Sequence, residues 1–285
     1  MAGSRCIFAS DLHGRPDRFE KLFLAVLDER PDVVFLGGDL LPHRWSNLFK
    51  AGSQFDELFV NPMRWLKDAL GKTRPRIFIV LGNDDERVAE ELFIDGQRKG
   101  LWEYIHNRSA EVGGHRVIGY ACVPPTPFLL KDWERYDVGR FADPGCVSPE
   151  AGYRTVPVDA DDIRSGTIAG DLNRLVGDVD LERTVLLLHT PPYQTNLDRA
   201  ALDGRKVDHV PVDVHVGSIA VKRLIEDRQP LLTLHGHIHE SAAITGSWRD
   251  RVGRTHLFSA AHDGPELALV RFDLEDLDRA TRQLV

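Results

Sequence analysis

The chain has 285 residues, of which 42% are hydrophobic, 8% aromatic and 28% charged. This is the composition of a globular protein with enough apolar side chains for a sizeable core, and it excludes disordered, collagen-like and low-complexity chains. The formal net charge of −8 excludes a protein that binds nucleic acid through bulk positive charge.

The sequence also argues against a membrane-spanning protein and against a disulfide-bonded scaffold. No segment approaches the roughly 20 apolar residues that span a bilayer, and the first residues lack the apolar stretch of a signal peptide. We therefore expect a cytoplasmic protein. Cys6, Cys122 and Cys146 are an odd number without short paired spacings, so we expect reduced thiols and neither disulfides nor a thiolate zinc site.

The first 90 residues alternate short apolar runs with helical patterns. An apolar run at 6–9 precedes a helix over about 16–29, in which Phe19, Leu22, Phe23 and Val26 recur on one face. A second run at 33–36 completes a strand–helix–strand unit, which predicts a parallel strand pair. A helix near 55–70, a strand at 77–81 and a helix near 88–93 follow.

Residues from about 120 to 170 are rich in proline and lack a regular apolar period. We interpret them as an insertion or cap within a single domain that spans residues 1–285, since loops of this length in compact proteins are usually functional or disordered. The alternation then resumes with a strand at 185–188, a helix near 218–228 and a strand at 231–234. The last runs, 256–258 and 267–270, are predicted to be antiparallel strands.

Side chains able to bind a metal follow five of the apolar runs. In chain order they are Asp11, His13, Asp39, Asn83, His189, His237 and His239. In open α/β sheets ligands collect outside the carboxyl ends of the strands, so these side chains are expected to converge although they are far apart in sequence.

The local spacing supports a metal site. Asp11 and His13, like His237 and His239, are two residues apart, and an extended backbone sends such side chains to the same side. Each segment alone also has an ordinary interpretation as a turn, a helix cap or a buried histidine. Together they form seven oxygen and nitrogen ligands without a thiolate, which exceeds one tetrahedral site and suits two divalent ions.

The ordered motifs resemble those of the calcineurin-like metallophosphoesterase superfamily. The resemblance covers about residues 5–90 and 184–262, and the segments 189–193 and 217–241 are most similar to its small Icc-like branch. It implies a four-layer α/β/β/α sandwich, in which two mixed β-sheets are flanked by helices. It also implies a dinuclear metal site at the strand ends.

The resemblance assigns roles to individual residues. One ion would be held by Asp11, His13 and His239 and the other by Asn83, His189 and His237, with Asp39 bridging both. A hydroxide bridging the ions would attack phosphorus, so Asp39 and Asn83 are expected to be catalytic. Mixed imidazole and carboxylate ligands accept Mn, Fe, Zn or Co, of which Mn is the first choice.

One family motif is altered in this chain. The family has Gly-Asn-His followed by an acidic residue, and its histidine stabilises the transition state or protonates the leaving oxygen. Here Asn83 is followed by Asp84 and Asp85, so Asp84 stands in the position of that catalytic histidine. Asp84 is a catalytic candidate that could donate a proton only if the site raises its pKa. We hypothesise that the enzyme prefers good leaving groups or uses another acid, for which the candidates are His43, His215 and His262. Arg15, which could reach a phosphate, and these three histidines are the candidate substrate-binding residues.

The sequence therefore predicts a metal-dependent phosphoesterase that acts on a phosphomonoester or phosphodiester of a small molecule, such as a nucleotide. Trp133, Tyr136 and Tyr153 are candidates for stacking on a base or sugar, with burial in the core as the alternative. A non-catalytic binding module on the same fold is the competing interpretation, and the complete ligand set favours catalysis. A nuclease is disfavoured by the net charge of −8 and the lack of a Lys/Arg-rich run.

Overall fold

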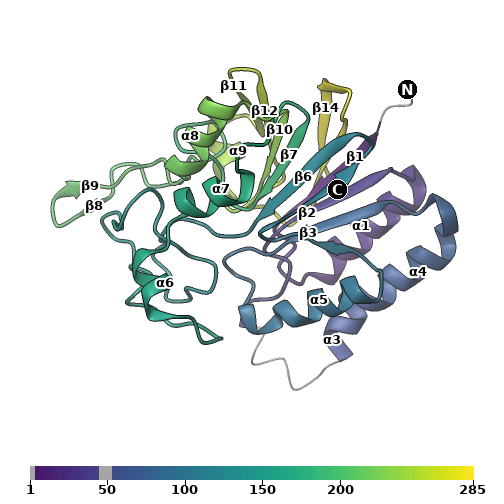
Figure 1. Ribbon diagram of the computed structural model, residues 1–285, viewed down its shortest axis with the longest axis horizontal. Helices are drawn as coiled ribbons and strands as arrows, with labels where there is room; N and C mark the ends of the chain where they lie inside the picture. The colour runs from purple at the N-terminus through teal and green to yellow at the C-terminus, as the bar shows by residue number, and fades with distance from the viewer. Residues whose placement is uncertain (1–3, 45–52) are drawn as a thin grey trace.

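The computed structural model describes residues 4–44 and 53–285, and it contains two mixed six-stranded sheets packed face to face (Figure 1). The first sheet has the order β14–β13–β1–β2–β3–β4, with bounds Asp276–Leu284, Ala268–Asp273, Arg5–Ala9, Val33–Gly37, Arg76–Val80 and Glu103–Tyr104. The second has the order β11–β12–β10–β7–β6–β5, with bounds Arg249–Val252, Thr255–Ser259, Leu232–His235, Thr184–Leu188, His115–Tyr120 and Arg108–Val112.

Four neighbouring strands of each sheet are parallel, and antiparallel strands extend the edges. In the first sheet β1, β2, β3 and β4 are parallel, while β13 runs antiparallel to β1 and β14 antiparallel to β13. In the second, β6, β7, β10 and β12 are parallel and β5 and β11 antiparallel to them. The carboxyl ends of the parallel strands therefore lie along one edge of each sheet.

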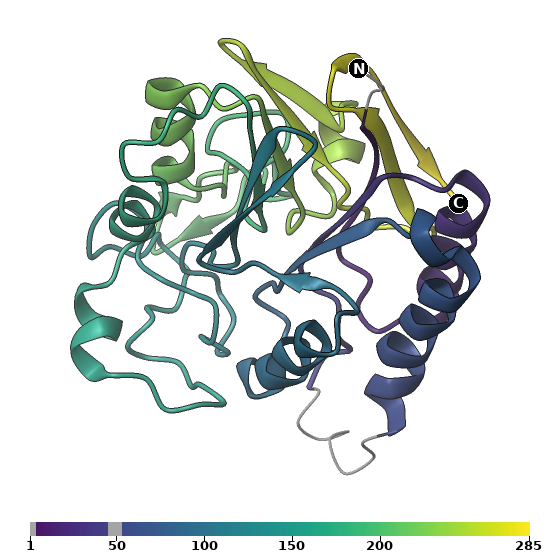
Figure 2. The ribbon, with the colours of Figure 1, turned by 45° about the vertical axis from the view of Figure 1, so that its right-hand side comes forward.

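Helices cover the outer face of each sheet. The helices α1 (Pro16–Glu29), α4 (Asn61–Leu70) and α5 (Glu90–Arg98) lie on the side of the first sheet, and α7 (Ile168–Val176) and α8 (Ile219–Arg228) on the side of the second (Figures 1 and 2). Shorter elements are α3 (Ser53–Phe55), α6 (Ala160–Ser165), α9 (Ser241–Thr245) and the hairpin of β8 (Lys206–Val207) and β9 (Val210–Pro211). The predicted four-layer sandwich is confirmed.

The period of two in each strand explains why two cores form. Along β1, Phe8 faces the other sheet while Ile7 packs with the helices, and along β2 Phe35 and Val34 alternate in the same way. Both faces of these strands are buried, which is why the sequence shows continuous apolar runs there.

Several predicted boundaries differ from those observed. The helix expected near 55–70 includes a π-helical stretch, Asp56–Val60, before α4, and the helix expected near 88–93 is α5, preceded by a 3₁₀ turn at Arg87–Ala89. The insertion has no helix or sheet strand from 121 to 159, but α6 and the start of α7 lie within the range predicted to be irregular. No helix in the described ranges is both long and apolar enough to cross a membrane.

The prediction that 256–258 and 267–270 pair with each other is wrong. β12 lies in the second sheet beside β10, whereas β13 lies in the first sheet beside β1, so the chain crosses between the sheets at 260–267. Each of these two strands instead pairs with an adjacent strand in a hairpin, β12 with β11 and β13 with β14. The sequence pattern does not reveal β11 or β14.

Candidate metal centre

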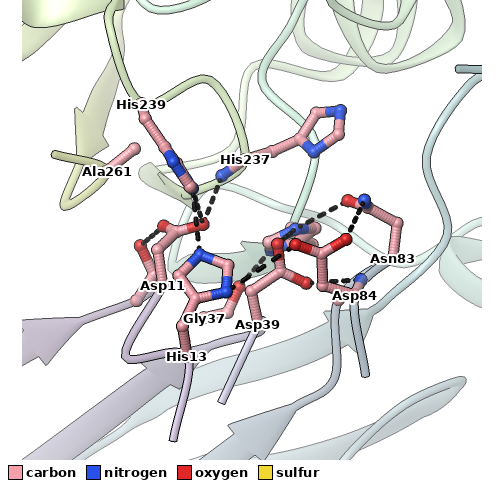
Figure 3. A network of polar contacts seen from close by, with 12 residues as sticks. Asp11, His13, Gly37, Asp39, Asn83, Asp84, His237, His239 and Ala261 are labelled. Carbon is pink, nitrogen blue, oxygen red and sulfur yellow. Dashed lines mark hydrogen bonds and ion pairs between the residues drawn. The ribbon is translucent and has the colours of Figure 1, made fainter. Parts of the chain in front are cut away.

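The seven predicted ligands meet where the carboxyl ends of strands from both sheets approach each other (Figure 3). Asp11 and His13 follow β1, Asp39 follows β2 and Asn83 follows β3 in the first sheet. His189 follows β7, and His237 and His239 follow β10 in the second. Five loops from two sheets thus contribute to one site.

The first group of ligand atoms belongs to Asp11, His13, Asp39 and His239, all within 4.8 Å of one another. The Nε2 atoms of His13 and His239 lie 3.2 Å apart, and Nε2 of His239 lies 3.1 Å from Oδ1 of Asp11. Convergence of imidazole and carboxylate ligand atoms at these distances fits a divalent transition ion.

The second group consists of Asp39, His189 and His237, again within 4.8 Å of one another. Nε2 of His189 lies 3.2 Å from Oδ2 of Asp39 and 3.2 Å from the amide Oδ1 of Asn83. Asp39 belongs to both groups, so its carboxylate lies within 4.8 Å of candidate ligand atoms in each of them.

The charge of the site also fits cations. Asp11 and Asp39 are buried, and their only ion pairs among the described residues are with His239 and His189. Burial raises the pKa of Asp11, but the hydrogen bond and charge of His239 outweigh it and lower that pKa to about 2. Burial likewise lowers the pKa of His189, but Asp39 outweighs it and raises that pKa to about 10. The protons on His239 and His189 thus balance the negative charge of the Asp11 and Asp39 carboxylates, which bound cations would otherwise neutralise.

The second ring nitrogen of His189 fixes its orientation. Nδ1 lies 2.7 Å from the carbonyl oxygen of Gly37, so the Nδ1–H donates there and Nε2 is left for a metal. Asp11 is held by the hydroxyl of Ser10, which donates to Oδ2, and by the backbone N–H of His237, 3.1 Å from Oδ1. Sequence reasoning missed Ser10 and Gly37, which carry no ligand chemistry of their own.

Unusual backbone conformations place the ligands. Asp11, His13, Asp39 and His237 all have positive φ, between 50° and 75°. Gly38 has φ 98°, and a Cβ there would lie 2.5 Å from Nδ1 of His189. Glycine is therefore needed at 38 both for the conformation and for the approach of the histidine.

Asp84 and His43 lie at the rim of the first ligand group. Oδ2 of Asp84 lies 3.4 Å from Nδ1 of His43 and 3.7 Å from Nδ1 of His13. The ring of His43 stacks on that of His13 with centroids 5.2 Å apart and an interplanar angle of 21°. Burial, together with the negative charge of Asp39, raises the pKa of Asp84 to about 6.

The other predicted substrate contacts pair with carboxylates outside the ligand groups. Arg15 pairs with Asp17 at 2.9 Å, Nδ1 of His215 with Asp198 at 2.9 Å, and Nε2 of His262 with Glu266 at 3.0 Å. Their roles in substrate binding remain predictions.

The aromatic residues of the insertion divide into two kinds. Trp133 and Tyr136 are buried, at 1% and 3% exposure, as the alternative interpretation expected, and Tyr153 is exposed. Only Tyr153 of the three has a surface available for stacking on a ligand.

Several known proteins are similar to this chain in sequence or in structure. A 36% identical match over 86 residues to the uncharacterized protein MJ1162 of Methanocaldococcus jannaschii covers 29% of this chain and 34% of that protein, so this chain aligns with about a third of its relative's length. The crystal structure of TT1561 of Thermus thermophilus is 17% identical, with a TM-score of 0.57 and 99% of each chain covered. A dimetal phosphatase from Danio rerio is 13% identical, with a TM-score of 0.54 and coverage of 94% of this chain and 95% of that one.

The two structural likenesses show a shared fold. The sequence profile of the calcineurin-like phosphoesterases matches residues 4–241, which include all seven ligands and Asp84. This chain therefore belongs to the calcineurin-like phosphoesterase family.

Proposed function

We propose that the protein is a phosphoesterase that uses two divalent ions to hydrolyse a phosphomonoester or phosphodiester of a small molecule, such as a nucleotide. The observation that carries this proposal is the position of Asp39, whose carboxylate lies within 4.8 Å of ligand atoms in both groups. A site for one ion would not need a carboxylate shared in this way.

The ligand groups define which residues would hold each ion. Asp11, His13 and His239 would hold one ion, Asn83, His189 and His237 the other, and Asp39 both. When bound, two divalent ions supply an activated water and positive charge for the phosphoryl oxygens. Manganese is the first choice for assay, and iron, zinc and cobalt also suit these ligands.

His43 is the candidate to protonate the leaving oxygen in place of the histidine that Asp84 replaces. Its Nδ1 faces the Asp84 carboxylate at 3.4 Å, so Nε2 is the ring nitrogen free to carry a proton toward substrate. His215 and His262, the other candidates, pair with Asp198 and Glu266. Asp84 then serves to orient His43 rather than to donate the proton itself.

The proposal is tested with a screen of phosphomonoesters and phosphodiesters in the presence of Mn²⁺. We expect turnover by the native chain and none by Asp39→Asn, which removes the shared charge while keeping the side-chain shape. Normal activity of Asp39→Asn would overturn the bridging role. Native protein that binds Mn²⁺ but hydrolyses no activated ester would instead indicate a binding module on this fold.

The role of His43 is tested with diesters of graded leaving-group acidity. We expect His43→Gln to lose roughly 10²- to 10⁴-fold in rate on poor leaving groups, the usual value of general acid catalysis, and little on good ones. His256→Gln is the matched control, because that histidine also faces a carboxylate, that of Asp278, and is not among the candidate site residues. A uniform loss across all leaving groups would contradict proton donation by His43.

A further inference from the structure

The insertion contacts the loops of the metal centre through Trp133. This residue comes from the irregular segment 121–159, and its side chain is 1% exposed. Its indole Nε1–H donates to the backbone carbonyl oxygen of Asp85 at 2.6 Å. Asp85 is two positions after the ligand Asn83, so the insertion reaches the loop that follows β3.

The side chain of Asp85 joins two ligand-bearing loops. Its buried carboxylate accepts hydrogen bonds from the backbone N–H groups of Leu40 and Leu41 at 2.9 and 2.7 Å through Oδ1. Its Oδ2 accepts from the N–H of Gly82 at 2.9 Å. One residue thus links the loop of Asp39 to the loop of Asn83.

Neighbouring groups fix the indole in place. The guanidinium of Arg87 lies 5.1 Å from the centroid of a Trp133 ring, and the ring of His106 meets the indole edge-on at 5.0 Å. Next to Trp133, Oδ2 of Asp132 accepts from the backbone N–H of Arg87 at 2.8 Å. The segment 132–133 therefore holds the segment 85–87 at two backbone positions.

We propose that Trp133 is a positioning residue for the metal centre and that, through Asp85, it sets the placement of Asp39 and Asn83. The segment 121–159 then helps to hold the proposed ligands in position. This inference rests on the proposed metal-dependent function. Residues that orient metal ligands without contacting the metal typically contribute about 10- to 100-fold to metal affinity, because the ligand atoms must lie within a small distance of their ideal positions.

The test compares Trp133→Phe with Trp102→Phe. Trp102 is a matched control because it is also buried and its Nε1–H also donates to a backbone carbonyl, that of Phe93, at 2.8 Å. Each variant keeps an aromatic ring and removes one buried indole N–H. Mn²⁺ is titrated calorimetrically onto metal-free protein, and thermal unfolding of the same metal-free samples is recorded.

We expect both variants to unfold at lower temperature than the native chain, and only Trp133→Phe to bind Mn²⁺ about 10- to 100-fold more weakly. Native Mn²⁺ affinity in Trp133→Phe would overturn the inference. Asp85→Asn, which replaces one acceptor oxygen by a donor, provides a second variant and is expected to weaken Mn²⁺ binding in the same direction. A native chain that binds no divalent ion would refute the proposed function instead.

Discussion

His106 is a histidine that the folded protein keeps neutral. Burial, together with the nearby guanidinium groups of Arg87 and Arg135, lowers its pKa to about 3 from an ordinary value of 6.5. The backbone N–H of Ala121 donates to its Nδ1 at 3.0 Å, which requires an unprotonated nitrogen there. Protonation would remove this acceptor and place a further positive charge near these arginines.

His106 should make stability depend on pH. Between pH 6.5 and 3 the unfolded chain binds a proton at this histidine and the folded chain does not, so the free energy of unfolding falls as pH falls. Between about pH 7 and 5 we expect the native chain to lose about 1–2 kcal/mol more than His106→Asn, since each unit of pKa shift corresponds to about 1.4 kcal/mol. Urea unfolding at both pH values measures the decrease in the free energy of unfolding. An equal decrease in the native chain and in His106→Asn would contradict a contribution of His106.

The residues that sequence could and could not identify differ in a physical way. Asp11, His237 and the other ligands have side chains whose chemistry is recognisable, and they stand at the ends of apolar runs. Trp133 acts through a hydrogen bond to a backbone carbonyl 48 positions away, and any residue would offer the same carbonyl. No residue type or spacing in the sequence marks such a contact.

At the scale of secondary structure, α8 is held at its N-terminus by two side chains. The hydroxyl oxygen of Ser218 accepts from the N–H of Val221 at 3.1 Å. Asp137 of the insertion accepts from the N–H groups of Ile219 and Ala220 at 2.6 and 3.2 Å and from the hydroxyl of Ser218. The negative charge of Asp137 also interacts favourably with the helix dipole.

Removing this second cap should destabilise the fold. We expect Asp137→Ala to reduce the free energy of unfolding by about 2 kcal/mol, at the upper end of measured caps, because two partly buried N–H groups and the Ser218 hydroxyl lose their acceptor. Asp159→Ala is the control, since Asp159 caps the short helix α6 in an exposed position and should cost about 1 kcal/mol or less. Chemical denaturation gives the decrease in the free energy of unfolding for each variant. An equal decrease in both would contradict a larger contribution of Asp137 to helix capping.

Elements with both faces buried were the easiest to predict. β1, β3 and β7 are apolar after their first residue and β2 is apolar up to its terminal glycine, and α1 presents a regular apolar face, so each is identifiable from local sequence. β14 and β5 alternate exposed charged residues with partly buried ones, and only tertiary pairing makes them strands. The mistaken pairing of β12 with β13 has the same origin, because local pattern does not specify to which sheet a strand is added.

In the whole molecule the proposed metal ligands come from both sheets. Asp11, Asp39 and Asn83 follow strands of the first sheet, and His189 and His237 follow strands of the second. A bound cation would therefore bridge the two halves of the sandwich as well as the ligands themselves. Metal binding and global stability should be coupled, since the unfolded chain does not present the site.

Mn²⁺ should raise the midpoint of thermal unfolding. At a free concentration of about 100 times its Kd, one bound ion adds about 2.7 kcal/mol to the free energy of unfolding. Differential scanning calorimetry with Mn²⁺ and with a chelator measures the shift, and Asp39→Asn should show little of it. An unchanged midpoint in the native chain at saturating Mn²⁺ would contradict a cation that links the two sheets.

Four of the proposed ligands, Asp11, His13, Asp39 and His237, adopt left-handed backbone conformations that side chains with a Cβ disfavour by about 1–2 kcal/mol each. Glycine would relieve that cost at every one of these places and would abolish chelation. Selection of variants for thermal stability alone would therefore favour glycine at these positions and the loss of the proposed ligands. Engineering a more stable variant requires metal binding or turnover to be measured in every round of selection.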